Sequence, residues 1–321
     1  MTTDTAPALG GRRAALPRLV SDYGVYAAVL VLLAYNAVFT PYFLDAGNLR
    51  TQLVQAAPIV IVALGMALVI GSEGIDLSVG SVMALAAAVI PLYLGFGMWP
   101  AVLMALLAGI AAGLFNGTLV AVVGLQPIVA TLALLVAGRG LALVFAGGQL
   151  KQLHNPELLA LGDGELAGVP VIVLAAAGLT LATAILVGRT TYGRQLVAVG
   201  GNRPAAVLAG LPVRRILITA YVLCGLFAAV AGVFATARLT ASDPSAIGNL
   251  AELSAITAVV VGGTPLTGGR VRVLGTVAGA MLMQLVRATL IKHDLPDSAA
   301  QMAQAAIILV AVYVARERRT R

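Results

Sequence analysis

The amino-acid sequence predicts an all-α integral membrane protein with about ten transmembrane helices. Hydrophobic residues make up 60% of the chain, charged residues only 10%, and the mean hydropathy is +1.00. A soluble domain carries about 25% charged residues, so this chain has too few polar residues to cover a soluble core. The hydrophobic residues also form blocks of roughly 20 residues, the length at which a helix crosses a bilayer.

The blocks follow one another in a single membrane domain over residues 23–315, between a basic tail at 1–22 and a second tail at 316–321. The first block is uncharged, the second has Pro58 near its start, and the fifth begins at Pro127. The eighth is the shortest, because glycine and proline crowd its end. The ten predicted spans cover residues 23–44, 53–71, 75–96, 100–123, 127–145, 169–187, 216–236, 253–261, 273–291 and 299–315.

The distribution of basic residues indicates how the spans are oriented. If the N-terminus is cytoplasmic, fourteen of the 20 Lys and Arg residues fall in cytoplasmic loops and tails, and four fall in outside loops. Basic residues favour the cytoplasmic side of a membrane, so we expect both termini to be cytoplasmic. The same bias explains the excess positive charge through orientation and contact with lipid headgroups, without nucleic acid as a partner.

Missing motifs exclude several classes of enzyme. A nucleotide-binding phosphate loop needs glycine followed by Lys and then Ser or Thr, but Lys151 precedes Gln152 and Lys292 precedes His293. The sequence has neither a His-Glu-x-x-His motif nor a Gly-x-Ser-x-Gly motif. Its two histidines are distant from each other, and Cys224 is its single cysteine. We therefore expect no catalytic residue, metal or cofactor in this chain.

Polar side chains within or beside the spans are the candidates for a substrate path. Asp76 and Ser78 interrupt a long apolar run, where polar groups are costly unless they face protein or a water-filled path. Asp76 could cap the helix that follows it or contact the substrate. The other candidates could line the path or form hydrogen bonds between helices. They are Asn116, Gln126, Thr131 and Glu252.

Small residues and one arginine predict contacts inside the membrane. Glycines recur every four residues in spans four and nine, a spacing that lets two helices approach closely. Arg139 lies near the middle of span five, where a charge is costly. It could reach outward, pair with an acid or take part in the path. The glycines are Gly109, Gly113 and Gly117 in span four, and Gly275 and Gly279 in span nine.

The basic connection over residues 188–215 is the longest predicted on the cytoplasmic side. Its middle is predicted to form a short helix. Asn202 can cap this helix, Pro204 suits its first turn, and Gly210 ends it. Such an insertion could be a docking surface for a soluble partner. It could also be a solvated linker that only obeys the charge bias.

Four stretches in order resemble the monosaccharide permeases of bacterial ATP-binding-cassette importers, the ribose, xylose, arabinose and galactose group. They are Gly74–Ser81, Gln126–Leu132, Thr191–Gly210 and Val261–Arg270. The resemblance covers residues 50–312, and the part over residues 124–152 is most similar to permeases of the galactofuranose type. The group often has Gly-Gly-Ile-Asp where this chain has Glu73 and Gly74.

The resemblance implies a non-catalytic permease subunit in the bacterial inner membrane, with an architecture similar to that of the vitamin B12 importer permease. It implies a second permease subunit, identical or related, and a periplasmic or extracellular sugar-binding protein. Neutral path groups suit a sugar, which presents many hydroxyls. Cytoplasmic ATP-binding subunits would dock on the 188–215 connection. Its candidate coupling residues are Tyr192, Gly193, Arg194, Asn202, Ala205 and Gly210.

Two other classes of function remain alternatives. An ion-gradient-driven secondary transporter would need no ATPase, but proton relays usually place several acids within spans. Here Glu73, Asp76 and Glu252 all lie at span ends, which favours the importer subunit. A membrane scaffold without transport is the third hypothesis, and copurification with ATP-binding subunits would distinguish the importer subunit from it.

Overall fold

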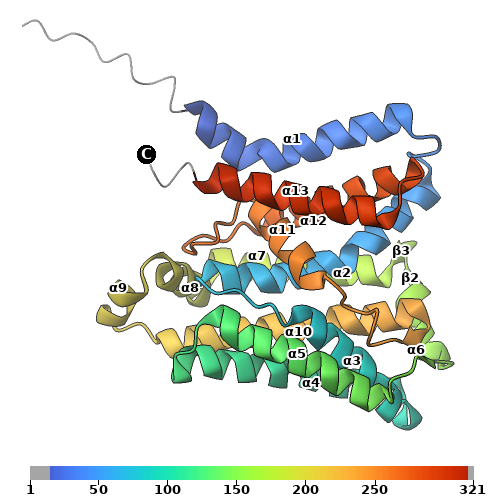
Figure 1. Ribbon diagram of the computed structural model, residues 1–321, viewed down its shortest axis with the longest axis horizontal. Coiled ribbons are helices and arrows are strands. Elements are labelled where there is room, and N and C mark those ends of the chain that lie inside the picture. Colours follow the sequence, from blue (N-terminus) through green and yellow to red (C-terminus); the bar gives the residue numbers. More distant parts are fainter. Residues whose placement is uncertain (1–14, 317–321) are drawn as a thin grey trace, which may run out of the picture.

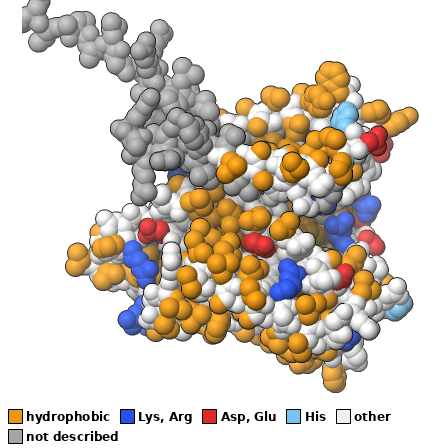
Figure 2. All heavy atoms as spheres, in the orientation of Figure 1, with side chains coloured by type: hydrophobic (Ala, Val, Ile, Leu, Met, Phe, Trp, Pro, Cys, Tyr) orange, Lys and Arg blue, Asp and Glu red, His pale blue; other side chains and the backbone are white. Residues whose placement is uncertain are grey.

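Long apolar helices lie side by side through the molecule (Figure 1). The computed structural model describes residues 15–316, so residues 1–14 and 317–321 of the two predicted tails lie outside the described residues. Helix α1 (Ala15–Phe39) begins before the predicted end of the N-terminal tail. Figure 2 shows hydrophobic side chains over much of one face, with most charged side chains toward its two ends, as a bilayer requires.

Seven helices in the described part of the chain are long and apolar enough to cross a membrane. All seven coincide with predicted spans, and α3 and α4 are prolonged by the short helices η1 (Leu94–Phe96) and η2 (Leu119–Val123). The seven are α2 (Ala46–Gly71), α3 (Val79–Tyr93), α4 (Met98–Thr118), α5 (Pro127–Ala146), α7 (Val171–Arg189), α10 (Val213–Leu239) and α12 (Val273–Lys292).

The first, eighth and tenth predicted spans are helical too. They correspond to α1, α11 (Ala251–Val261) and α13 (Asp297–Arg316). Helix α11 is apolar but shorter than the spanning length. Helix α11 rises only about 16 Å at 1.5 Å per residue, about half of a hydrocarbon core.

The two ends of the helical bundle differ in structure. At one end lie α8 (Thr191–Gly201) and α9 (Arg203–Leu208), together with the start of α1 and the end of α13 (Figure 1). At the other lie α6 (Pro156–Asp163) and a hairpin of β2 (Glu165–Leu166) with β3 (Val169–Pro170). Strand β1 (Lys151–Gln152) pairs antiparallel with β4 (Ala241–Ser242). The sequence did not predict α6, α8 or these strands.

The predicted glycine contacts are confirmed. A Cβ atom at Gly113 would lie 2.7 Å from the Val222 Cα, and one at Gly117 would lie 2.9 Å from the Ile218 Cα, so α4 and α10 touch through their backbones. Gly109 meets α10 in the same way. Helices α11 and α12 touch similarly, because a Cβ atom at Gly279 would overlap the Ala258 carbonyl.

Two non-helical segments interrupt the bundle, of which the first is mostly buried and the second is partly exposed. The first, residues 72–78, separates α2 from α3, and the second, residues 243–250, leads into α11. Glu73 and Leu250 adopt positive φ angles of 68° and 56°, which helical residues do not. We call residues 72–78 the first break and residues 243–250 the outer segment. A Cβ atom at Gly80 would overlap the Gly248 carbonyl oxygen, so the outer segment lies against the start of α3, just beyond the first break.

Candidate functional site

Asp76 is the centre of the first break. Its Oδ1 atom accepts hydrogen bonds from the backbone N–H of Ser78 at 3.0 Å and from the Ser78 hydroxyl at 2.6 Å. Ser78 is the N-cap residue of α3, and its own side chain forms no capping bond. Asp76 therefore stabilises the turn that leads into α3. Both side chains are buried in this structure.

Helices α4 and α10 complete this cluster. The Asn116 Nδ2 atom of α4 donates to the Ser78 hydroxyl at 2.9 Å and to Asp76 Oδ1 at 3.4 Å. Helix α10 places the Cys224 thiol beside the Asp76 carboxyl, and it places the Tyr221 hydroxyl near Gly74. We call Asp76, Ser78, Asn116, Tyr221 and Cys224 the polar centre. All five are at most 1% exposed.

Two atoms of the polar centre have no hydrogen-bond partner among the described residues. They are the Asn116 Oδ1 atom and the Tyr221 hydroxyl. Buried polar groups are paired in the great majority of cases, so unpaired ones point to strain or to function. Sequence reasoning found Asp76, Ser78 and Asn116 but missed Tyr221 and Cys224. No sequence signal marks those two, since both lie inside an apolar block.

Helix α5 brings Thr131 to the same region but leaves Gln126 outside it. The buried Thr131 hydroxyl lies 2.9 Å from the Pro127 carbonyl of its own helix and 3.4 Å from the Ile75 carbonyl of the first break. Gln126 is exposed at the start of α5 and its side chain makes no capping bond. The two candidates therefore occupy different environments.

Glu252 and Arg139 meet at the outer segment. The Arg139 guanidinium donates to three backbone carbonyls of this segment, and Glu252 is its charged neighbour. Glu252 is 9% exposed, and its Oε2 atom has no hydrogen-bond partner among the described residues. A Cβ atom at Gly80 would overlap this oxygen. Glu252 thus contacts the start of α3 from the side of the outer segment.

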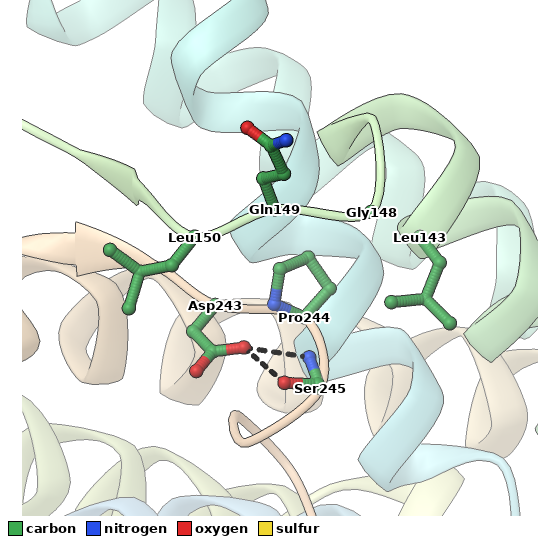
Figure 3. A pocket seen from close by; sticks show the side chains of 7 residues that line it. All are labelled: Leu143, Gly148, Gln149, Leu150, Asp243, Pro244 and Ser245. Atoms are coloured by element: carbon green, nitrogen blue, oxygen red, sulfur yellow. Dashed lines mark hydrogen bonds between the residues drawn. The ribbon is translucent and has the colours of Figure 1, made fainter.

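A small polar pocket opens at the end of the bundle that carries the β-strands. Its volume is about 110 Å³, and Figure 3 shows the Asp243–Ser245 turn facing Leu143 and the Gly148–Leu150 stretch across it. Asp243 accepts hydrogen bonds from the Ser245 side chain and backbone, which hold the pKa of its carboxyl below the ordinary value. The turn at the start of the outer segment is therefore internally braced.

A larger pocket lies on the flank of the bundle. It measures about 390 Å³ and is lined by apolar side chains of α2, α7 and α12, with Thr180 as its polar member. It does not include any residue of the polar centre. A hydroxyl-rich solute would find few partners there. The polar centre is therefore the better candidate for the path.

The connection over residues 188–215 forms a helix–turn–helix element. The Asn202 side chain accepts from the Ala205 N–H at 3.0 Å and begins α9, and Gly210 follows its end with φ of 73°. The predicted capping and termination of α9 are therefore confirmed. Helix α8, which precedes it, was not predicted. It is capped by Thr190, whose hydroxyl accepts from the Gly193 N–H at 3.2 Å.

The six candidate coupling residues divide into two groups. Tyr192 and Gly193 face inward: the Tyr192 hydroxyl donates to the Ile216 carbonyl at 3.3 Å, and a Cβ atom at Gly193 would overlap the end of α7. Burial raises the pKa of Tyr192, so this phenol stays neutral. The exposed group faces away from the bundle and consists of Arg194, Asn202, Ala205 and Gly210.

The described residues contain no group of three or more His, Cys, Asp or Glu side chains that could hold a metal ion. The arrangement of the site is that of a closed polar cluster between broken helices. Such breaks are tolerated at membrane depth where they are buried in protein or line a cavity. The cluster can offer hydrogen bonds to a neutral polar solute when the segments around it separate.

Comparison with known proteins identifies related chains. Residues 48–312 match a family described as branched-chain amino acid transport system / permease component. The galactofuranose transporter permease protein of Escherichia coli (strain K12) is 39% identical over 301 residues, which cover 91% of this chain and 88% of that protein. The ribose import permease protein of the same strain is 37% identical over 98% of each chain. The L-arabinose transporter permease protein of Azospirillum brasilense is 32% identical over 98% of this chain and 94% of its own.

Proposed function

The chain belongs to this family of transport permease components, and we propose that it is the membrane subunit of an ATP-binding-cassette importer that forms the path for a monosaccharide. The observation that supports this most is the similarity, over nearly the whole chain, to permeases named for galactofuranose, ribose and L-arabinose. Those three sugars differ in ring and configuration. They share an uncharged ring with several hydroxyls, and we propose that the substrate of this chain has the same chemistry.

The polar centre suits that chemistry. Hydroxyl and amide groups give hydrogen bonds of modest net strength, about 0.5–1.5 kcal/mol each, so a sugar could be held and then released. Asn116 Oδ1 and the Tyr221 hydroxyl have no partner among the described residues in the closed arrangement, and they would be free to accept from or donate to sugar hydroxyls. We propose that Asp76, Ser78, Asn116 and Thr131 line the path, and that Glu252 borders it.

The remaining parts of the assembly follow from the same proposal. The chain would cross the bacterial inner membrane about ten times, in an architecture similar to the vitamin B12 importer permease, with both tails in the cytoplasm. A second permease subunit, identical or related, would complete the pore. A periplasmic or extracellular sugar-binding protein would deliver the substrate at the end of the bundle that carries α6 and the β-hairpin.

Helices α8 and α9 would receive the ATP-binding subunits. The docking surface would include Val207 and Leu208, which are 58% and 90% exposed, although apolar side chains of this size normally avoid water. The element also contacts the end of α2, next to the first break: a Cβ atom at Gly200 would overlap the Gly71 carbonyl. A movement of α8 would therefore reach the residue that precedes the break.

Reconstitution in liposomes tests the function. The purified permease, its ATP-binding subunits and its sugar-binding protein are assayed with a panel of radiolabelled solutes. We expect uptake of a pentose or hexose that needs ATP and all the components. Uptake by the permease alone under a proton or sodium gradient would replace the importer by a secondary transporter. ATP-dependent uptake that prefers a charged solute would support the importer mechanism but refute a sugar as its substrate.

A substitution at the coupling element tests the docking. Leu208→Asp places a charge on the exposed apolar tip of α9, so the permease should insert normally and lose its ATP-binding subunits in copurification. Leu166→Asp is the matched control, because Leu166 is 67% exposed at the opposite end of the molecule. Equal recovery of the ATP-binding subunits with both variants would refute docking on α9.

A further inference from the structure

Helix α5 runs along the first break and then reaches the outer segment. The Thr131 hydroxyl lies near the Ile75 carbonyl at 3.4 Å, and the Ser81 hydroxyl donates to the Leu134 carbonyl at 3.1 Å. Arg139 lies two turns beyond Thr131 on the same helix. Helix α5 is thus the scaffold that both irregular segments share.

Arg139 binds the outer segment by its backbone. Its Nη1 atom donates to the Pro244 and Ile247 carbonyls at 2.6 and 2.8 Å, and its Nη2 atom donates to the Gly248 carbonyl at 3.2 Å. A guanidinium presents five donors in a rigid fork. Three carbonyls that converge on one fork fix the path of the segment, which has no helix or strand of its own to do so.

The position of the outer segment matters because of its contact with α3. A Cβ atom at Gly248 would lie 3.0 Å from the Met83 Cβ and would overlap the Gly80 carbonyl. Gly80 is two residues from Ser78, which is hydrogen-bonded to Asp76 and Asn116. Holding the carbonyls of the outer segment therefore keeps this segment packed against the helix that begins at the polar centre.

Glu252 offers Arg139 a second partner. It lies in the first turn of α11, directly after the outer segment, and it is the charged neighbour of Arg139. Its Oε2 atom has no hydrogen-bond partner in the part of the chain that the structure describes. A carboxylate and a guanidinium can form two parallel hydrogen bonds. A small displacement would let Arg139 exchange the carbonyls for this carboxylate.

We propose that Arg139 is a positioning residue for transport: it holds the outer segment closed against α3, and it releases this segment by transferring its hydrogen bonds to Glu252. The inference rests on the proposed transport function. It assigns the outer gate of the path to residues 243–250. It also explains why an arginine, which is costly inside a membrane, is placed where it binds backbone carbonyls.

Spin labels at the outer pocket test the first half of the proposal. Leu143→Cys and Ser245→Cys are both exposed and line the same pocket (Figure 3), whereas the native Cys224 is fully buried. In the full chain in lipid nanodiscs, dipolar broadening between the labels reports how closely the outer segment follows α5. Arg139→Gln should reduce the broadening, and Arg139→Lys, which keeps charge and one donor group, should reduce it less.

Arg50→Gln is the matched control for the spectra. Arg50 forms an ion pair with Glu165 on the exterior and takes no part in holding the outer segment, so its loss should leave the broadening unchanged. A spectrum of the Arg139→Gln variant identical to that of the parent would overturn the proposal. Thermal unfolding of each variant separates release of the segment from general loss of structure.

A reversible tether tests the second half. A bifunctional thiol linker between the same two cysteines would fasten the outer segment to α5 in the reconstituted importer. We expect sugar uptake to be lost, to return after reduction with dithiothreitol, and to persist when a monofunctional reagent labels both sites. Glu252→Gln should also lose uptake while it keeps the spectral broadening, because only the alternative partner is removed.

The outcomes separate this inference from the proposed function. Uptake that continues unchanged in the tethered complex would refute the role of the outer segment as a gate, but it would not contradict the proposed sugar-importer function. A parent complex that takes up no sugar would refute the proposed function, and the Arg139→Gln spectrum would then decide alone whether Arg139 holds the outer segment.

Discussion

Replacing Asp76 separates its role as a hydrogen-bond acceptor from its charge. In Asp76→Leu, the Ser78 N–H and hydroxyl lose the acceptor that they share at 3.0 and 2.6 Å, and both stay buried. Each orphaned donor costs about 1–3 kcal/mol, so the pair should cost about 2–6 kcal/mol of the free energy of unfolding. Asn116 keeps its bond to the Ser78 hydroxyl and adds little to this figure.

Asp76→Asn retains an oxygen in the position of Oδ1, so both Ser78 donors keep a partner. The bonds become weaker by about 1 kcal/mol each when a charged acceptor becomes neutral, and the burial of a charge is relieved in the same step. We therefore expect the Asn variant to lie within about 1–2 kcal/mol of the parent, to retain much of the sugar uptake, and to be clearly more stable than the Leu variant.

Reversible unfolding in mixed detergent micelles, followed by circular dichroism, measures the difference, and uptake is assayed on the same preparations. Equal unfolding free energies for the Asn and Leu variants would refute the argument from Ser78. Complete loss of uptake in both variants, with the Asn variant stable, would show that the carboxylate charge itself is needed for transport.

Three further predictions concern packing, topology and pH. Gly113→Val should destabilise the chain by about 1–3 kcal/mol because α4 and α10 touch there. Gly140→Ala should instead be neutral or stabilising by up to about 1 kcal/mol, since no described residue lies within 4 Å of its Cβ position; thermal unfolding compares the two. Cysteines at Gln152 and Ala205, both exposed, should react with an impermeant thiol reagent from opposite sides of the membrane, and reaction from one side would refute the proposed topology. The lowered pKa of Asp243 means that its turn is stabilised at neutral pH and loses this support as the pH falls through the folded-state pKa, below 3.8. Spin labels at Leu143 and Ala246, both exposed, keep the Ser245 hydroxyl that lowers this pKa, and the pair should broaden less in acid.

The helices were predictable because bilayer length and proline mark their limits. Helix α5 begins at Pro127 and α9 at the Asn202 cap, as the residues indicated. Helix α8 was missed because Gly193, Gly200 and Gly201 argue against a helix by propensity. In the structure, glycines of α8 allow close backbone contacts: Gly193 packs on the end of α7, and Gly200 packs on Gly71. Helix propensity depends only on local sequence, whereas the need for glycine at these positions comes from contact with a neighbouring helix.

The polar centre was predictable only in part, for a related reason. Asp76, Ser78 and Asn116 were visible as polar residues in apolar sequence, and they do meet. Tyr221 and Cys224 lie on α10, and the close packing of α10 on α4 and on α2 through glycines brings them to Asp76. Arg139 was expected to reach outward, pair with an acid or take part in the path. It binds carbonyls of a segment more than 100 positions away, which no local pattern encodes.

A chain of backbone contacts joins the two ends of the molecule through the polar centre. Gly200 of α8 packs on Gly71, which is also hydrogen-bonded through its carbonyl to the Gly269 N–H at 3.0 Å. The first break follows Gly71 directly, and Gly80 at its far side packs on Gly248 of the outer segment. Contacts between backbones have no side chain to absorb a displacement, so α8 and the outer segment are coupled more stiffly than side-chain packing would allow. In the proposed importer, the mechanical link between the ATP-binding subunits and the outer gate would therefore lie in the first break rather than in the apolar flank.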